Sequence, residues 1–176
     1  PWVVSARTSL AQCPDNLKSC LTETGSLTKH LSQYCDNDNK LSFNLLNQQW
    51  NKPWSAENKL LNLPISQYAM IREVVIGYKG NDWMYARSIF PQKAFQKRKH
   101  QLSRLNLPLA NILFSDRNIV RISMSIDKIC PNFLSTNRFF IEKQLINESL
   151  WSRRSLFTIH ASPILVGHLL AHSFNS

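Results

Sequence analysis

The sequence predicts an α+β fold in one domain that spans residues 1–176, with about six mostly sequential, antiparallel strands. About six segments carry the alternating or β-branched apolar pattern of strands. Helical patterns occupy the first and middle thirds of the chain rather than alternating with the strands. The chain has 176 residues, of which 43% are hydrophobic, so it can bury one sizeable core.

Two short helices are predicted before the first strand. An amphipathic stretch opens at residues 14–16, and Gly25 ends it. Ser26 can N-cap a second helix, because a serine side chain accepts a hydrogen bond from the first helical turn. The apolar positions are Leu17, Cys20 and Leu21 in the first helix, and Leu27, Leu31 and Tyr34 in the second.

The first strand is predicted from Leu41, Phe43 and Leu45, which alternate with polar residues. A connector rich in tryptophan and proline follows at residues 50–54. It leads to a short helix at residues 55–58.

The clearest pattern is a β-hairpin, in which the apolar, β-branched runs 71–77 and 83–91 flank a turn rich in Gly, Asn and Asp. Side chains alternate between the faces of a strand, so Arg72 lies on the same face as Val74 and Ile76. A guanidinium group on an apolar face is costly unless an anion pairs with it.

Two partners for Arg72 stay open at this point. One is a structural carboxylate such as Glu142 or Glu148. The other is the carboxylate of a bound ligand.

A strongly basic helical stretch is predicted at residues 92–104, and a further helical turn at 108–114, with Pro108 at its first position. The basic side chains are those of Lys93, Lys97, Arg98, Lys99, His100 and Arg104. With few aromatic residues among them, they indicate a solvated helix face, with weak contact with an anionic membrane as an alternative. Specific nucleic-acid binding is not expected, since no known module is present.

The last third of the chain predicts three more strands. Residues 119–126 alternate, and a helix is predicted at 139–145 in a less regular segment. A second hairpin follows, with strands at 153–160 and 164–171 and a tight turn at 161–163. In the strand at 119–126, one set of alternating residues is Ile119, Arg121, Ser123 and Ser125, and the other is Val120, Ile122, Met124 and Ile126.

Composition narrows the function classes. The 21 basic and 11 acidic residues give a net charge of +10, which favours anionic partners. No apolar run approaches the ~20 residues that span a bilayer, and residues 1–5 lack the features of a signal peptide. A cytoplasmic location is therefore expected.

Metal sites are not expected. Cys13, Cys20, Cys35 and Cys130 form no Cys-x-x-Cys pair, so reduced thiols are the simpler interpretation. No Asp or Glu lies in the last hairpin to complete a metal site with its histidines, which are His160, His168 and His172.

Taken together, several ordered motifs from about residue 20 to the C-terminus resemble the chorismate–pyruvate lyase family. They fall in the family's order with nearly its spacing. They are Gly25 to Lys29; Ile71 to Ile76; Gly80 with Trp83, Ala86 to Ser88 and Pro91; Leu105 to Leu109 with Leu113 and Phe114; Trp151 to Ser155; and Pro163 to Val166.

This resemblance implies a six-stranded antiparallel sheet with helices on one side and an internal ligand pocket under helical flaps. It also implies the site residues. Arg72 would bind a ligand carboxylate, Leu27 and Leu109 would donate backbone N–H groups from helix starts, and Ala86 would line the pocket where the family often has Gly. His168 stands where the family has a glutamate on the last strand.

The implied reaction converts chorismate to 4-hydroxybenzoate and pyruvate, without a cofactor, in a protein expected to be monomeric. The ether oxygen gains a proton and ring carbon C4 loses one. Histidine, like glutamate, can shuttle a proton or hydrogen-bond the product hydroxyl, so His168 and Arg72 are the predicted catalytic residues. The alternative is a binding module that keeps the pocket for an aromatic acid and has weak or no activity.

Overall fold

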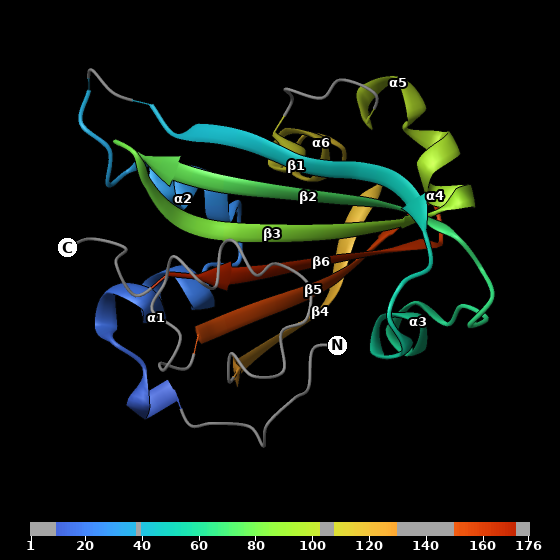
Figure 1. The fold of residues 1–176 in the computed structure, drawn as a ribbon, viewed down its shortest axis with the longest axis horizontal. Helices are drawn as coiled ribbons and strands as arrows, with labels where there is room; N and C mark the ends of the chain where they lie inside the picture. Colours follow the sequence, from blue (N-terminus) through green and yellow to red (C-terminus); the bar gives the residue numbers. More distant parts are fainter. Residues whose placement is uncertain (1–9, 38–39, 103–107, 130–149, 172–176) are drawn as a thin grey trace.

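A computed structural model describes residues 10–37, 40–102, 108–129 and 150–171. Its centre is a six-stranded antiparallel sheet with the strand order β1-β2-β3-β6-β5-β4, which runs from top to bottom in Figure 1. The strands are β1 Ser42–Asn51, β2 Ala69–Tyr78, β3 Asn81–Pro91, β4 Ile119–Ile129, β5 Leu150–Ile159 and β6 Ser162–Leu170. The predicted α+β fold with six antiparallel strands is confirmed.

The helices are short and lie close to the predicted positions. They are the 3₁₀ turn η1 Leu10–Gln12 and the helices α1 Asp15–Thr22, α2 Leu27–Ser32, α3 Ser55–Leu61, α4 Gln92–Lys97, α5 Lys99–Leu102 and α6 Leu109–Ser115. The Ser26 side chain caps α2 as predicted, accepting a hydrogen bond from the Lys29 N–H at 3.2 Å. The basic stretch predicted as one helix forms two, because the chain leaves helical geometry at Arg98 (φ −133°).

Each hairpin turns through two residues with positive φ. In the β2–β3 turn these are Lys79 and Gly80, as the predicted hairpin required. The turn predicted at residues 161–163 is displaced, because His160 and Ala161 are the residues with positive φ. A two-residue turn of this kind matches the twist of the strands. Pro163 belongs to β6, near its first residue, where a missing N–H is tolerated.

The two faces of the sheet are covered differently. On one face, α1 and α2 share a core with β2, β3, β5 and β6, and α4 to α6 share a second core with β2 to β6. On the other face, Leu61 of α3 packs with Ile71, Ile89 and Leu165. The cavity described below lies on the first face.

The opposite face holds a buried ion-pair network. Arg87 on β3 donates from Nε to Glu57 of α3 at 2.8 Å and from Nη1 to Glu73 of β2 at 2.9 Å. The Tyr85 hydroxyl donates to Glu73 at 2.5 Å, and the Arg87 guanidinium stacks on Trp54 at 3.8 Å. Burial, and then Glu73, raise the pKa of Tyr85. This network joins α3 to the central strands, directly behind the cavity.

Several sequence-based predictions fall outside the described residues. These are the helix at 139–145 and the residues Arg104, Cys130, Glu142, Glu148 and His172. Cys13, Cys20 and Cys35 carry free thiols, and burial raises the pKa of Cys13 and Cys20 to about 11. Within the described ranges, each helix is too short or too polar to cross a membrane.

Candidate functional site

An internal cavity of about 50 Å³ lies on the sheet face that α2 and α6 cover. All six strands contribute to its wall, together with α2 and with α6 and the residue before it. The described residues that line it are Thr28, Phe43, Arg72, Val74, Ile76, Met84, Ala86, Ser88, Pro108, Leu109, Ala110, Leu113, Phe114, Arg121, Arg153, Phe157, Val166 and His168. The wall is therefore mostly apolar, with a few basic side chains.

Four of the five predicted site residues meet in this cavity: Arg72, Ala86, Leu109 and His168. They come from the hairpin β2–β3, from α6 and from β6, three regions that are well separated in the sequence. The Leu27 side chain is buried in the core with α1 instead, and its neighbour Thr28 lines the cavity. The role assigned to the Leu27 N–H group stays a prediction.

Strand register explains why these side chains converge. Ala86 on β3 pairs with His168 on β6, and His168 pairs with Arg153 on β5. Arg72 pairs with Ser88, one same-face step along β3 from Ala86. His168 and Arg153 therefore lie side by side, whereas Arg72 lies two strands away from His168, in the order β2-β3-β6.

The polar lining is basic. Burial lowers the pKa of Arg72, Arg121 and Arg153, the last to about 10. Burial, followed by the charges of Arg153 and Arg121, lowers the pKa of His168 to about 3, so its imidazole is neutral at physiological pH. Among the described lining residues there is no carboxylate. The cavity thus suits an anionic, largely apolar ligand.

Arg153 and Arg154 are neighbours on β5 but have different environments, because successive side chains of a strand point to opposite faces. Arg153 lines the cavity and donates from Nη1 to the carbonyl oxygens of Cys20 at 3.2 Å and Glu23 at 2.7 Å. Arg154 points to the opposite face and pairs with Asp127 at 2.9 Å. Arg153 is therefore the member of this pair that can contact a ligand.

Arg121 is a cavity residue that the sequence analysis missed. It had been grouped with Ser123 and Ser125, but a β-bulge between Arg121 and Ser123 shifts the register, so Arg121 shares a face with Met124. Its guanidinium donates to the carbonyl oxygens of Thr24 and Gly25 and lies 5.0 Å from the centre of the Phe157 ring. A bulge leaves no clear mark in an alternating pattern.

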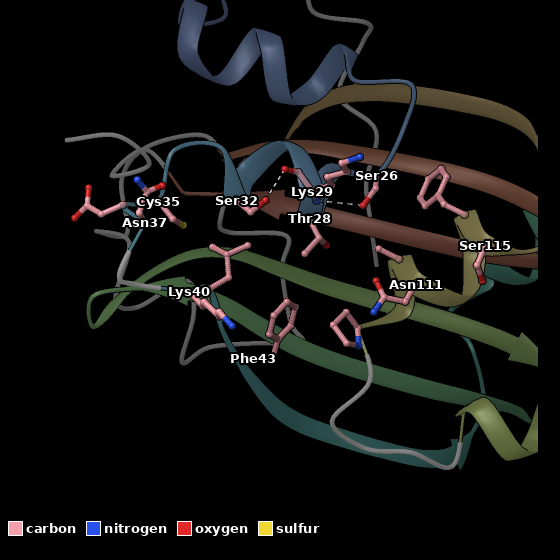
Figure 2. A pocket seen from close by; sticks show the side chains of 15 residues that line it. Ser26, Thr28, Lys29, Ser32, Cys35, Asn37, Lys40, Phe43, Asn111 and Ser115 are labelled. Carbon is pink, nitrogen blue, oxygen red and sulfur yellow. Dashed lines mark hydrogen bonds between the residues drawn. The ribbon is translucent and has the colours of Figure 1, made fainter.

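A wider groove of about 730 Å³ adjoins the cavity. Figure 2 shows Thr28 of α2, Phe43 of β1 and Asn111 of α6 around it. The groove and the cavity share five lining residues, namely Thr28, Phe43, Pro108, Ala110 and Phe114. A cavity of about 50 Å³ holds only a few water molecules. A ring acid needs more room than this, and the adjoining groove is open to the same lining residues.

Two side chains of the basic stretch at residues 92–104 make contacts that hold the fold together. Lys97 donates to the His160 carbonyl oxygen at 2.8 Å and to the Ser162 hydroxyl at 3.1 Å, and Arg98 pairs with Asp116. Lys93, Lys99 and His100 are exposed, in keeping with the predicted solvated face. The alternative partners of Arg72, Glu142 and Glu148, lie outside the described residues, so that alternative stays open.

Comparison with known proteins was made at the level of family, sequence and structure. A family model described as chorismate lyase matches residues 2–174. The "probable chorismate pyruvate-lyase" of Coxiella burnetii is 28% identical over 158 residues, which cover 89% of this chain and 83% of that protein. The chorismate pyruvate-lyase of Pectobacterium carotovorum is 26% identical over 157 residues, covering 89% and 77% respectively.

Similar solved structures share the fold at low identity. PhnF from Mycobacterium smegmatis superposes with a TM-score of 0.65 at 11% identity, covering 88% of this chain and 67% of that one. The ligand-binding domain of a GntR-family transcriptional regulator from Bordetella bronchiseptica gives a TM-score of 0.57 at 10% identity, covering 79% and 89%. These likenesses show a common fold.

Proposed function

The chain belongs to the chorismate lyase family, and on this premise we propose that it converts chorismate to 4-hydroxybenzoate and pyruvate in the cavity on the sheet face. The observation that carries the proposal is the meeting of Arg72, Ala86, Leu109 and His168 in one cavity. Each was expected at a ligand from a different segment of the sequence.

The reaction is an elimination that makes the ring aromatic. The bond between ring carbon C3 and the ether oxygen breaks, and C4 loses its proton. The C4–H electron pair becomes part of the aromatic ring, and the enolpyruvyl group leaves. It gains one proton and, in its keto form, is pyruvate, so no oxidant, reductant or cofactor is needed.

We assign Arg72 the role of holding the ring carboxylate. Its guanidinium can donate two parallel N–H hydrogen bonds to a carboxylate, and such bonds are strongest away from water. The cavity wall around it is apolar, with Val74, Ile76 and Met84 nearby in the lining. The ring then extends over Ala86, where a methyl group rather than a hydrogen atom faces it.

His168 is assigned to the end of the ring that carries the C4 hydroxyl. Because its pKa is lowered to about 3, it is a weak base at neutral pH. A neutral imidazole can still donate one hydrogen bond and accept another. We therefore assign it the role of holding the C4 hydroxyl while the proton passes to the leaving enolpyruvyl group.

The test measures whether 4-hydroxybenzoate and pyruvate form in equal amounts. Purified protein is incubated with chorismate, 4-hydroxybenzoate is measured by absorbance, and pyruvate by a coupled enzyme. The expected result is equal amounts of both products, with the rate reduced at least about 100-fold in Arg72→Ala, since a charged hydrogen-bonding partner is lost. Arg154→Ala, a change on the opposite sheet face, is the control and should keep activity.

The alternative function is a binding module that holds an aromatic acid without converting it. It is favoured by the cavity's neutral His168 and by the absence of a carboxylate among its described lining residues. A stable protein that shows no turnover, but whose melting temperature rises with 4-hydroxybenzoate, would establish this alternative. His168→Glu would then show whether a carboxylate restores activity.

The proposal also covers the pathway, the location and the oligomeric state of the protein. The product would supply ubiquinone biosynthesis, and the protein would act in the cytoplasm as a monomer. Exposed Lys93, Lys99 and His100 offer a surface for weak contact with anionic membranes. Salt-sensitive binding to anionic vesicles would support that contact, and no binding at low salt would exclude it.

A further inference from the structure

Two guanidinium groups on the β4–β5 side of the cavity, that of buried Arg153 and that of half-buried Arg121, bond to uncharged groups within the described residues. Arg153 is 1% exposed, and it bonds to the carbonyl oxygens of Cys20 and Glu23. Arg121 bonds to those of Thr24 and Gly25. Carbonyl oxygens carry no net charge, and Nε of both arginines is buried without a hydrogen-bond partner in the described part of the chain.

The carboxylate of Glu23 attracts both arginines, but it is engaged elsewhere. It accepts a hydrogen bond from the Gly25 N–H at 2.5 Å and contacts His30 Nδ1 at 3.2 Å. Burial still lowers the pKa of both Arg121 and Arg153. A buried cation of this kind is stabilised when an anion joins it in the cavity.

This pair comes from β4 and β5, whereas Arg72 comes from β2. Arg72 lies on β2 and Arg153 on β5, three strand spacings apart in the order β2-β3-β6-β5. At about 4.8 Å per spacing, their backbones are roughly 14 Å apart. Side chains that reach into one cavity from these positions suit a ligand with two separate carboxylates.

We propose that Arg121 and Arg153 form a second carboxylate subsite, which binds the enolpyruvyl carboxylate of the substrate while Arg72 binds the ring carboxylate. This inference rests on the proposed function. The chemistry of the ligand also places the enolpyruvyl carboxylate near Arg153. Ring carbon C3, which bears the ether, is next to C4, whose hydroxyl is assigned to His168. The enolpyruvyl group must therefore lie beside His168, and the residue paired with His168 on β5 is Arg153.

The subsite makes the cavity selective for dianions. Chorismate occupies both subsites, whereas 4-hydroxybenzoate has one carboxylate and leaves the second subsite unfilled. The subsite also keeps the leaving group close until the C3–O bond has broken. We therefore expect dianionic ring acids to bind more tightly than matched monoanions.

The test compares two stable ligands by titration calorimetry. The dianion is 3-(carboxymethoxy)benzoate, and the monoanion is 3-methoxybenzoate, which has the same ring carboxylate and ether. The native sequence should bind the dianion at least about tenfold more tightly than the monoanion. One hydrogen bond to a charged group contributes an affinity factor of about this size. Arg121→Gln and Arg153→Gln should remove this preference and leave monoanion binding unchanged.

The control is Arg154→Gln, next in the chain but on the opposite face, which should keep the preference. Equal binding of both ligands by the native sequence would overturn the subsite, even if Arg153→Gln does not fold. An equal loss of affinity for both ligands in Arg121→Gln would also overturn it, since that result indicates a structural role for Arg121. Turnover of chorismate without a dianion preference refutes the subsite alone, and a dianion preference without turnover refutes only the lyase proposal.

Discussion

The neutral state of His168 has a measurable effect on stability. An unfolded histidine titrates near pH 6.5, whereas the folded pKa of His168 is about 3. Between these values the unfolded chain binds a proton that the folded protein does not, so stability falls as the pH decreases. From pH 7.5 to pH 5.0 this one group should cost about 2 kcal/mol of unfolding free energy.

The assay is urea denaturation without ligand at both pH values, for the native sequence and for His168→Gln. Glutamine cannot titrate, so the variant should lose about 2 kcal/mol less than the native sequence between pH 7.5 and pH 5.0. All other titrating groups are common to both proteins and cancel in the comparison. His100→Gln, an exposed change, is the control and should behave like the native sequence. An equal pH dependence in the native sequence and His168→Gln would refute the burial argument and the role assigned to this side chain.

Two further predictions concern the scaffold. Arg87→Met should lower the unfolding free energy by about 3–5 kcal/mol, because it leaves two buried glutamates without their cation. Urea denaturation checks it against the exposed Arg117→Met, and a loss below 1 kcal/mol would show that the network contributes little. Ser26→Ala should cost about 1 kcal/mol by removing the α2 cap. Ser32→Ala, at the other end of α2, should cost less, and equal costs would argue against a specific cap.

Local patterns predicted the framework well, for physical reasons. The alternation around Arg72 identified both its strand and its face, because a two-residue period leaves no other arrangement. The Ser26 cap was predicted because the hydrogen bond that forms it is local. Long-range strand pairing then brought Ala86 beside His168, two residues that the resemblance assigned to one pocket.

The errors occurred where geometry departs from a regular pattern. A β-bulge moved Arg121 to the cavity face, and no residue type marks that position. The second hairpin turns at His160 and Ala161, and alanine is not typical of positive φ. The turn was therefore predicted at residues 161–163, which include Ser162 and Pro163. The place of Arg153 beside His168 depends on the pairing of β5 with β6, which no pattern on β5 alone contains.

The most direct test of the central claim is a crystal structure of the protein with 4-hydroxybenzoate. The account predicts electron density for one ring in the cavity on the sheet face, with the carboxylate on Arg72 and the hydroxyl within hydrogen-bonding distance of His168. Density confined to the outer groove, or a ring carboxylate bound away from Arg72, would contradict it.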